Sequence, residues 1–227
     1  MKEQHAEEAI EELKKYGDNS KVQWKQCDLE DLEAVKQVGE ELKSELNRLD
    51  ALVLNAGIGV GVYNETKDGL GMSCEHDHAP STFADTHTFQ DSHFQVNVLS
   101  QHLLAMILLP VLKKTPNSRI VAQSSDLHMG APSDVAFASK AEINTDVGAM
   151  KLYGRSKLAQ ILWIRALNRR LLKGVPAGDQ SEERIFVNAT HPGGVETDQQ
   201  QQAVSPYCYI AWWHPADADP RLAPMVH

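Results

Sequence analysis

The sequence has little of what marks a secreted or nucleic-acid-binding protein. Its 227 residues contain three cysteines, Cys27, Cys74 and Cys208, which are odd in number and far apart. Such cysteines form no disulfide framework, so we expect reduced thiols in a cytoplasmic protein. Basic residues number 22 against 31 acidic ones, a formal charge of −9. This balance argues against nucleic acid and against an anionic membrane as partners.

Patterns for metal binding, membrane crossing and secretion are missing too. The stretch 74–78, which holds cysteine, aspartate and histidines, has no distal partner ligand, so no metal is predicted. The longest apolar run, Leu103–Leu112, is about half the length of a spanning helix, and we interpret it as part of a buried helix. Residues 1–16 form a charged amphipathic pattern, which is not typical of a signal peptide.

The pattern that is present is an alternation of short apolar strands with amphipathic helices. Strands are expected at Val22–Cys27, Ala51–Leu54, Ile120–Ser124 and Ile185–Ala189, and helices at residues 2–16, 31–46, 92–114 and 151–173. Hydrophobic residues make up 42% of the chain, enough for one packed core. The alternation predicts a single α/β domain over residues 1–227, with a three-layer, doubly wound parallel sheet of Rossmann-like type.

Three residue types that carry chemistry stand at informative places in this pattern. Tyr153 and Lys157 are four residues apart, on one face of an expected helix. An ammonium beside a phenol favours the phenolate and would lower its pKa from about 10. Ser125 follows a strand, where open α/β sheets place ligands, and its hydroxyl could hydrogen-bond a carbonyl oxygen.

Each residue also has an ordinary explanation. A tyrosine and a lysine four apart on a helix are commonly surface neighbours. Ser125 could simply cap the end of its strand, and Asn97, inside an expected helix, could be a structural amide whose hydrogen bonds are all made.

Five segments in a fixed order together resemble the short-chain dehydrogenase/reductase family. They are Leu49–Gly57 with its Asn-Ala-Gly end, Asn97, Arg119–Ser125, Tyr153-x-x-x-Lys157 and Asn188–Thr197 with its Pro-Gly pair. The match covers roughly residues 5–69 and 91–200. The long step from Ser125 to Tyr153 is similar to that of the retinol-dehydrogenase-like branch and its fungal relatives.

This resemblance implies an oxidoreductase that transfers hydride between a small carbonyl or alcohol substrate and NADP or NAD, with NADP favoured. Tyr153 would be the general acid/base. Lys157 would lower the pKa of Tyr153 and hold the nicotinamide ribose. Ser125 would polarise the carbonyl, and Asn97 would hold a water in the proton relay.

Further positions would contact the cofactor by the same resemblance. Asp28 would meet the adenine ring, and Asn55 would lie against the adenine ribose. Val195 and Thr197 would meet the nicotinamide carboxamide. Relatives of this kind also pair through the helices that match residues 92–114 and 151–173. A homodimer is one interpretation of the apolar faces there, and packing on the sheet is the other.

The sequence departs from the family pattern in three places. No TGxxxGxG turn is present, and the first two strands of the fold are expected to be missing. Residues 71–90 appear as an insertion, for which a retained intron is one hypothesis, and residues 205–227 form an atypical tail. An alternative interpretation is therefore a truncated, non-catalytic remnant. With no glycine-rich turn for the pyrophosphate, weak or absent dinucleotide binding is predicted.

Overall fold

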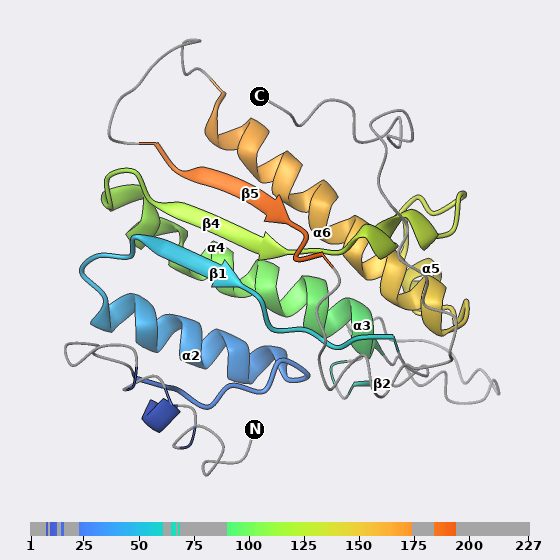
Figure 1. Ribbon diagram of the computed structural model, residues 1–227, viewed down its shortest axis with the longest axis horizontal. Helices are drawn as coiled ribbons and strands as arrows, with labels where there is room; N and C mark the ends of the chain where they lie inside the picture. The colour runs from blue at the N-terminus through green and yellow to red at the C-terminus, as the bar shows by residue number, and fades with distance from the viewer. Residues whose placement is uncertain are drawn as a thin grey trace, which may run out of the picture.

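Three parallel strands form the sheet at the centre of the molecule (Figure 1). The computed structural model describes residues 8, 10–12, 15, 23–60, 65, 66, 68, 90–173 and 184–193. The strands are β1 (Ala51–Leu54), β4 (Arg119–Gln123) and β5 (Phe186–Thr190), in the order β1-β4-β5. The register pairs Leu52 with Ile120 and Ile120 with Val187. The parallel sheet that the sequence predicts is therefore confirmed.

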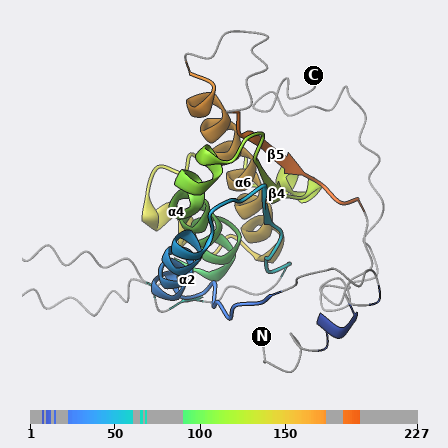
Figure 2. The same cartoon turned by 90° about the vertical axis from the view of Figure 1, so that its left-hand side faces the viewer.

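Three helices cover one face of this sheet: α2 (Leu32–Glu45), α4 (Ser100–Lys114) and α6 (Ala149–Leu171) (Figures 1 and 2). The strands are added in one direction, and each crossover is right-handed, so α4 and α6 must lie on the same side. A second helical layer, which the three-layer prediction requires, is not among the described residues. On the sheet's other face, Val53 is 63% exposed and Phe186 40% exposed.

The core lies between the sheet and these helices. Leu54, Ile120 and Val187 are buried on the strands, and Leu112 and Ile164 are buried on α4 and α6. Burial of such apolar side chains is the main term that stabilises the fold. The same burial fixes how close α6 lies to the ends of the strands.

Helix α2 is held at its first turn and along its length. The Asp31 carboxylate caps the helix by accepting hydrogen bonds from the backbone N–H groups of Glu33 and Ala34, at 3.1 and 3.2 Å. Further along, Gly39 faces Ile107 of α4 so closely that an added Cβ would lie 3.0 Å from the isoleucine Cδ1. The glycine therefore permits the close packing of α2 on α4.

The strand predicted at Val22–Cys27 is wrong. Residues 23–27 have no regular secondary structure. In a parallel sheet, a strand is stabilised by hydrogen bonds to its neighbours. No described strand lies between this segment and β1, so those bonds are not available to it. Lys25 instead pairs with Glu45 at the end of α2, at 2.8 Å.

The helix expected at 92–114 is present in three successive pieces. Helix α3 (Ser92–Phe94) is followed by one π-helical turn, η1 (Gln95–Leu99), and then by α4. The apolar run Leu103–Leu112 is too short to span a bilayer. The whole helical stretch Ser92–Lys114 is long and apolar enough to do so, by length and composition alone. More than half of it is buried inside the protein, as in the core helix of a soluble protein.

A short strand before the expected insertion pairs with a strand at its C-terminal end. Strands β2 (Glu65–Thr66) and β3 (Gln90–Asp91) pair in antiparallel fashion, with Glu65 opposite Asp91. Most of residues 71–90 fall outside the described residues, and so does the tail 205–227. At the other end, residues 8 and 10–12 of the helix expected at 2–16 are described and are helical.

The long connection between β4 and α6 contains two short helices, and a carboxylate on one of them is bound by backbone N–H groups of the same connection. The helices are the 3-10 helix η2 (Asp126–Gly130) and α5 (Lys140–Ile143). The Glu142 carboxylate of α5 accepts hydrogen bonds from the backbone N–H groups of residues 136, 137 and 138, at 2.7, 3.0 and 2.9 Å. These bonds lower the pKa of Glu142.

This carboxylate gives the loop a pH dependence that can be measured. Because the pKa of Glu142 is lower in the folded state, its contribution to stability is present above about pH 4.3 and is lost as the pH falls further. In Glu142→Gln, the free energy of unfolding should therefore fall less steeply as the pH is lowered into the acid range. Glu33→Gln, a change of charge on the exposed face of α2, is the control and should leave that fall steep. Identical curves for the two variants would contradict this role.

Candidate active site

Several side chains with chemical capacity meet where the three strands end. Asn55 follows β1, Ser125 lies two residues past β4, and His191 follows β5 directly. Carboxyl ends of parallel strands meet at one edge of a sheet, which is where open α/β folds bind ligands. Helix α6 runs beside this edge and brings Tyr153 and Lys157 to it (Figure 1).

Gly154 sets the distance between α6 and the chain that follows β4. A Cβ at this position would lie 2.7 Å from the Leu127 carbonyl oxygen and 2.9 Å from the Ala131 nitrogen, both backbone atoms of the loop. Only glycine leaves room for the backbone of η2 to rest directly on the helix. This contact places Ser125, which immediately precedes η2, next to Tyr153, which immediately precedes Gly154.

Two hydrogen bonds join the end of β4 to the Lys157 position. Ser124 Oγ donates to the Lys157 carbonyl oxygen at 3.0 Å, and Lys157 Nζ donates to the Gln123 carbonyl oxygen at 2.9 Å. Ser124 and Lys157 are both 5% exposed. The lysine ammonium is therefore fixed inside the site.

Burial of Lys157 has an electrostatic consequence. Desolvation of the ammonium lowers its pKa to about 8. A negatively charged ligand, or one rich in acceptor oxygens, placed beside it would favour the protonated form again. Its Nζ also lies 5.4 Å from the centroid of the Tyr153 ring, within range of a cation–π contact.

The Tyr153 phenol differs from the expectation in its acidity. From the sequence, Lys157 was expected to lower the pKa of Tyr153. In the structure that pKa is raised. Burial is the largest cause, a hydrogen bond with Ser125 opposes it, and the charge of Asp126 adds to it. The pKa of Lys157 is itself lowered to about 8, so the lysine is neutral at the pH at which the phenol ionises and has no charge to offset the burial.

Ser125 lies at the N-terminal end of η2 and caps it. Its Oγ accepts a hydrogen bond from the Leu127 N–H at 3.2 Å and donates to Asp126 Oδ1 at 3.1 Å. The Ser125 backbone carbonyl bonds to the His128 ring at 2.7 Å. Ser125 therefore caps the helix η2 rather than the end of its strand, the ordinary explanation expected from the sequence, and it also contacts Tyr153.

Asn97, in the π-helical turn η1, is fully buried, and both of its side-chain N–H donors and one lone pair of its Oδ1 are used. Its Oδ1 accepts from the Ile58 N–H at 2.9 Å, and its Nδ2 donates to the Ile58 carbonyl at 3.1 Å and to Ser156 Oγ at 2.9 Å. A Cβ on Gly57 would lie 2.8 Å from Asn97 Oδ1. The turn after β1 thus packs directly on the asparagine.

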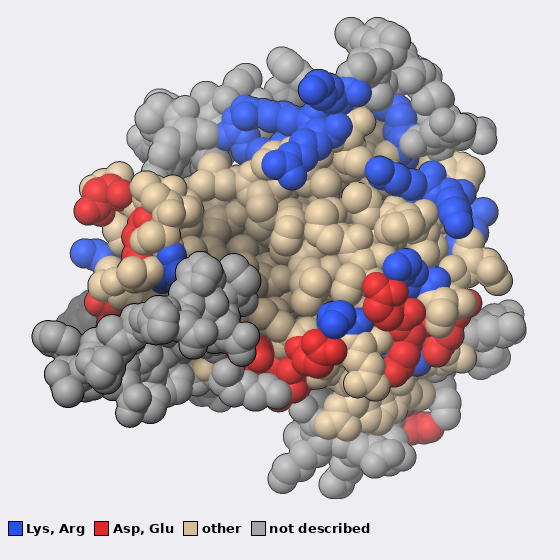
Figure 3. Space-filling model, turned by 180° about the vertical axis from the view of Figure 1, so that it is seen from behind, with Lys and Arg blue, Asp and Glu red and all other residues tan. Residues whose placement is uncertain are grey.

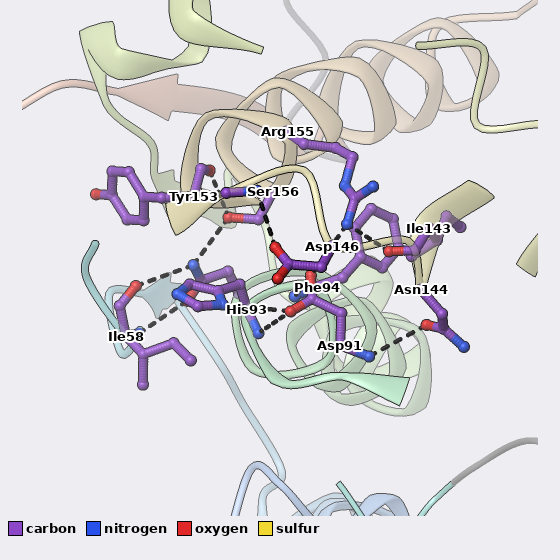
Figure 4. A network of polar contacts seen from close by, with 12 residues as sticks. Ile58, Asp91, His93, Phe94, Ile143, Asn144, Asp146, Tyr153, Arg155 and Ser156 are labelled. Carbon is purple, nitrogen blue, oxygen red and sulfur yellow. Dashed lines mark hydrogen bonds and ion pairs between the residues drawn. The ribbon is translucent and has the colours of Figure 1, made fainter. Parts of the chain in front are cut away.

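Behind the site, a second buried network fastens the loop to the helices (Figure 4). Arg155 donates to the backbone carbonyls of Glu142 and Ile143, and its Nη2 lies 3.5 Å from Asp91 Oδ2. Asp91 also caps α3 and contacts His93 at 3.2 Å. In Figure 4, Arg155 and Tyr153 point in different directions from α6, so the network supports the site without entering it.

Comparison with known proteins decides the family. A profile of the short chain dehydrogenase family matches residues 1–145. The chain belongs to this family.

Relatives in the family are named as oxidoreductases. A Neurospora crassa protein named oxidoreductase bli-4, mitochondrial, is 37% identical over 193 residues, covering 82% of this chain and 41% of that protein. Mouse retinol dehydrogenase 14 is 33% identical over 184 residues, covering 80% and 45%. A short-chain dehydrogenase/reductase of Armillaria gallica is 32% identical over 200 residues, covering 84% and 54%. The chain spans about half the length of these relatives.

Solved structures of the family share the fold. An oxidoreductase from E. coli superimposes with a TM-score of 0.59 and 21% identity, covering 89% of this chain and 66% of that one. A short chain dehydrogenase from Shigella flexneri 2a, solved with NADP, gives a TM-score of 0.55 and 20% identity, covering 85% and 64%. The incomplete Rossmann-like fold predicted from the sequence is confirmed.

The family-derived positions divide into two groups. Asn97, Ser125, Tyr153 and Lys157 all lie around the strand ends, so the structure brings the expected catalytic set together. Asp28 and Asn55 are exposed, and the Asp28 carboxylate accepts from the Glu30 N–H at 2.9 Å. Val195 and Thr197 lie outside the described residues, as do residues 74–78. In the described part of the chain no three potential ligands cluster for a metal ion, and the absence of a metal stays a prediction.

Sequence reasoning missed residues that this short-chain dehydrogenase site depends on. Gly154 and Ser156 lie inside the Tyr153–Lys157 motif, and Ser156 donates to the Tyr153 carbonyl at 2.8 Å while it accepts from Asn97. A glycine in the middle of a helix was the available signal for a close contact. Asp126 was also missed, although it is the next residue after Ser125 in the sequence, and His191 was missed because its nearness to this pair depends on the fold.

Gly154→Ala tests the contact between η2 and α6. Alanine favours a helix over glycine by about 1 kcal/mol. The clash with backbone atoms of η2 costs about 1–3 kcal/mol, and we expect it to prevail. Gly130→Ala, on η2 itself and with open space around an added Cβ, is the matched control. Denaturant unfolding should show Gly154→Ala destabilised and Gly130→Ala nearly unchanged. A Gly154→Ala protein as stable as the native one would contradict the contact.

Proposed function

We propose that this chain carries the proton-transfer centre of an oxidoreductase that interconverts a carbonyl and an alcohol with a nicotinamide dinucleotide. The observation that carries the proposal is the junction of Ser125, Tyr153 and a buried Lys157 at the ends of the strands. Open parallel α/β sheets bind their ligands at such strand ends. The named activities of the relatives support the same reaction class.

In the proposed reaction Tyr153 is the general acid for carbonyl reduction. Its pKa is raised by burial, so the phenol stays protonated at neutral pH and can donate a proton to a substrate oxygen. Ser125, in contact with the phenol, would orient the same oxygen. Asn97 would hold a water of the proton relay, positioned by Ile58 and Ser156. In alcohol oxidation, the same phenol must first lose its proton.

The described residues fit the nicotinamide end of a dinucleotide. Lys157 is buried and uses one of its three N–H donors on Gln123; the described residues supply no second acceptor. Hydroxyls of a ribose would satisfy such donors, so we propose that Lys157 holds the nicotinamide ribose. The bound nicotinamide would supply or accept the hydride.

The adenosine end is proposed to rest on exposed residues. Asp28 would meet the adenine ring and Asn55 its ribose. At the other end of the cofactor, Val195 and Thr197 would meet the nicotinamide carboxamide. NADP is proposed over NAD, and a short chain dehydrogenase of the same fold was solved with NADP. The chain's 227 residues include no TGxxxGxG turn for the pyrophosphate, so the expected affinity for the dinucleotide is low.

Pairing of two copies through α4 and α6 is part of the proposal. Leu108 on α4, and Leu158 and Leu167 on α6, are buried against the protein's own core. Other apolar residues of these helices, including Leu103, are only partly buried. The middle of the helix-covered face carries no charged side chain (Figure 3), which favours such pairing. We also propose that the protein is cytoplasmic, because it has few cysteines. We propose that neither nucleic acid nor a membrane is among its partners.

Tyr153→Phe tests the proposed reaction. Purified protein is assayed for NADPH oxidation with a panel of ketones and aldehydes. Loss of the general acid should reduce turnover by about 100-fold or more. Lys157→Met should also reduce turnover and weaken cofactor binding. Lys151→Met, an exposed lysine on the same helix, is the matched control and should leave both unchanged. Undiminished turnover in Tyr153→Phe, or no turnover in the native chain with any carbonyl, would contradict the proposal.

A further inference from the structure

An extra carboxylate, Asp126, lies beside the serine–tyrosine pair. Its Oδ1 accepts the Ser125 hydroxyl at 3.1 Å. On its other side stands His191: the Asp126 N–H points at His191 Nδ1 at 3.4 Å, and His191 Nε2 lies 3.7 Å from Asp126 Oδ2. The carboxylate, whose side chain is 40% exposed, is thus flanked by Ser125 after β4 and by His191 after β5.

Hydrogen bonds around Ser125 can be counted. A serine hydroxyl has one proton to donate and two lone pairs to accept with. The proton goes to Asp126 and one lone pair takes the Leu127 N–H. While Asp126 holds that proton, it is not available to a phenolate on Tyr153, so the carboxylate withholds the Ser125 hydrogen bond that lowers the pKa of Tyr153.

We propose that Asp126 is a positioning residue of the site, whose carboxylate takes the Ser125 proton and so keeps the phenol proton on Tyr153. Asp126 acts through Ser125 and need not touch the substrate. The residue lies outside the set of Asn97, Ser125, Tyr153 and Lys157 that the family resemblance supplies. This inference deepens the proposed function and rests on it for its catalytic meaning.

The charges that face the pair come from every element around it. Helix α6 contributes Lys157, whose ammonium is bonded to Gln123. Helix η2 contributes Asp126 and His128, and the His128 ring bonds the Ser125 carbonyl. The segment after β5 contributes His191, which contacts Asp126. Among these groups Asp126 is the negative charge, and its field raises the pKa of Tyr153 in addition to burial.

The consequence is an asymmetry between the two directions of the reaction. Carbonyl reduction uses the protonated phenol, which Asp126 preserves. Alcohol oxidation uses the phenolate, which the carboxylate opposes by charge and by occupying the proton of Ser125. Oxidation should therefore require a higher pH than it would without Asp126.

The test is a titration of Tyr153 in the intact chain, followed by NMR of protein labelled with 13C at the tyrosine ring carbon that bears the hydroxyl. The chain has five tyrosines, and Tyr153→Phe assigns the signal. Asp126→Asn removes the charge but keeps an acceptor for Ser125, whereas Asp126→Ala removes both. Asp134→Asn, an exposed aspartate of the same connection, makes the same charge change and is the control.

The expected result is graded. The acid dissociation constant of the Tyr153 phenol should rise roughly threefold to tenfold in Asp126→Asn and further in Asp126→Ala. In the assay of alcohol oxidation, the pH of half-maximal rate should fall by the same step. Asp134→Asn should leave both values unchanged.

Two failures can be told apart. If Asp126→Asn titrates like Asp134→Asn, the role of Asp126 is overturned whether or not the chain is active. If the titration shifts as expected but no variant turns over a substrate, the positioning role stands and the proposed function fails.

Discussion

The whole site depends on one contact, in which the backbone of η2 rests on helix α6 at Gly154. That contact has no side chain on the helix side, so the loop backbone approaches closer than any other residue would allow. It fixes Ser125 against Tyr153 and brings Asp126 beside them. Without it, the strand end and the helix would each keep their own structure, but the hydroxyl, the phenol and the carboxylate would no longer share one set of hydrogen bonds.

Burial at this contact decides the electrostatics. Lys157 and Tyr153 are both removed from water, and both respond by favouring their neutral forms: the pKa of the lysine falls to about 8, and that of the tyrosine rises. A protonated phenol and a lysine with donors to spare suit a site that awaits a ligand. A bound ribose would restore the ammonium, and the ammonium would then act on the phenol as the family resemblance implies.

Residue patterns predicted the parts of the fold that depend on local sequence. The bare apolar strands β1 and β4 and the periodic helices α2 and α6 are where the sequence places them, within two residues at their ends. The strand at Val22–Cys27 was wrong because a parallel strand needs a neighbour, which no local pattern encodes. The π-helical turn at Asn97, the contact of His191 with Asp126 and the raised pKa of Tyr153 depend on tertiary packing, so they could be found only from the structure.

If the contact at Gly154 governs the site, Ser125 and Tyr153 act as one unit. A double-mutant cycle on NADPH-dependent carbonyl reduction tests it most directly, using Ser125→Ala, Tyr153→Phe and the double variant. Residues that act together in one step lose their effect together, so the double variant should be no slower than Tyr153→Phe alone. Losses that multiply would show two independent contributions and would contradict the account.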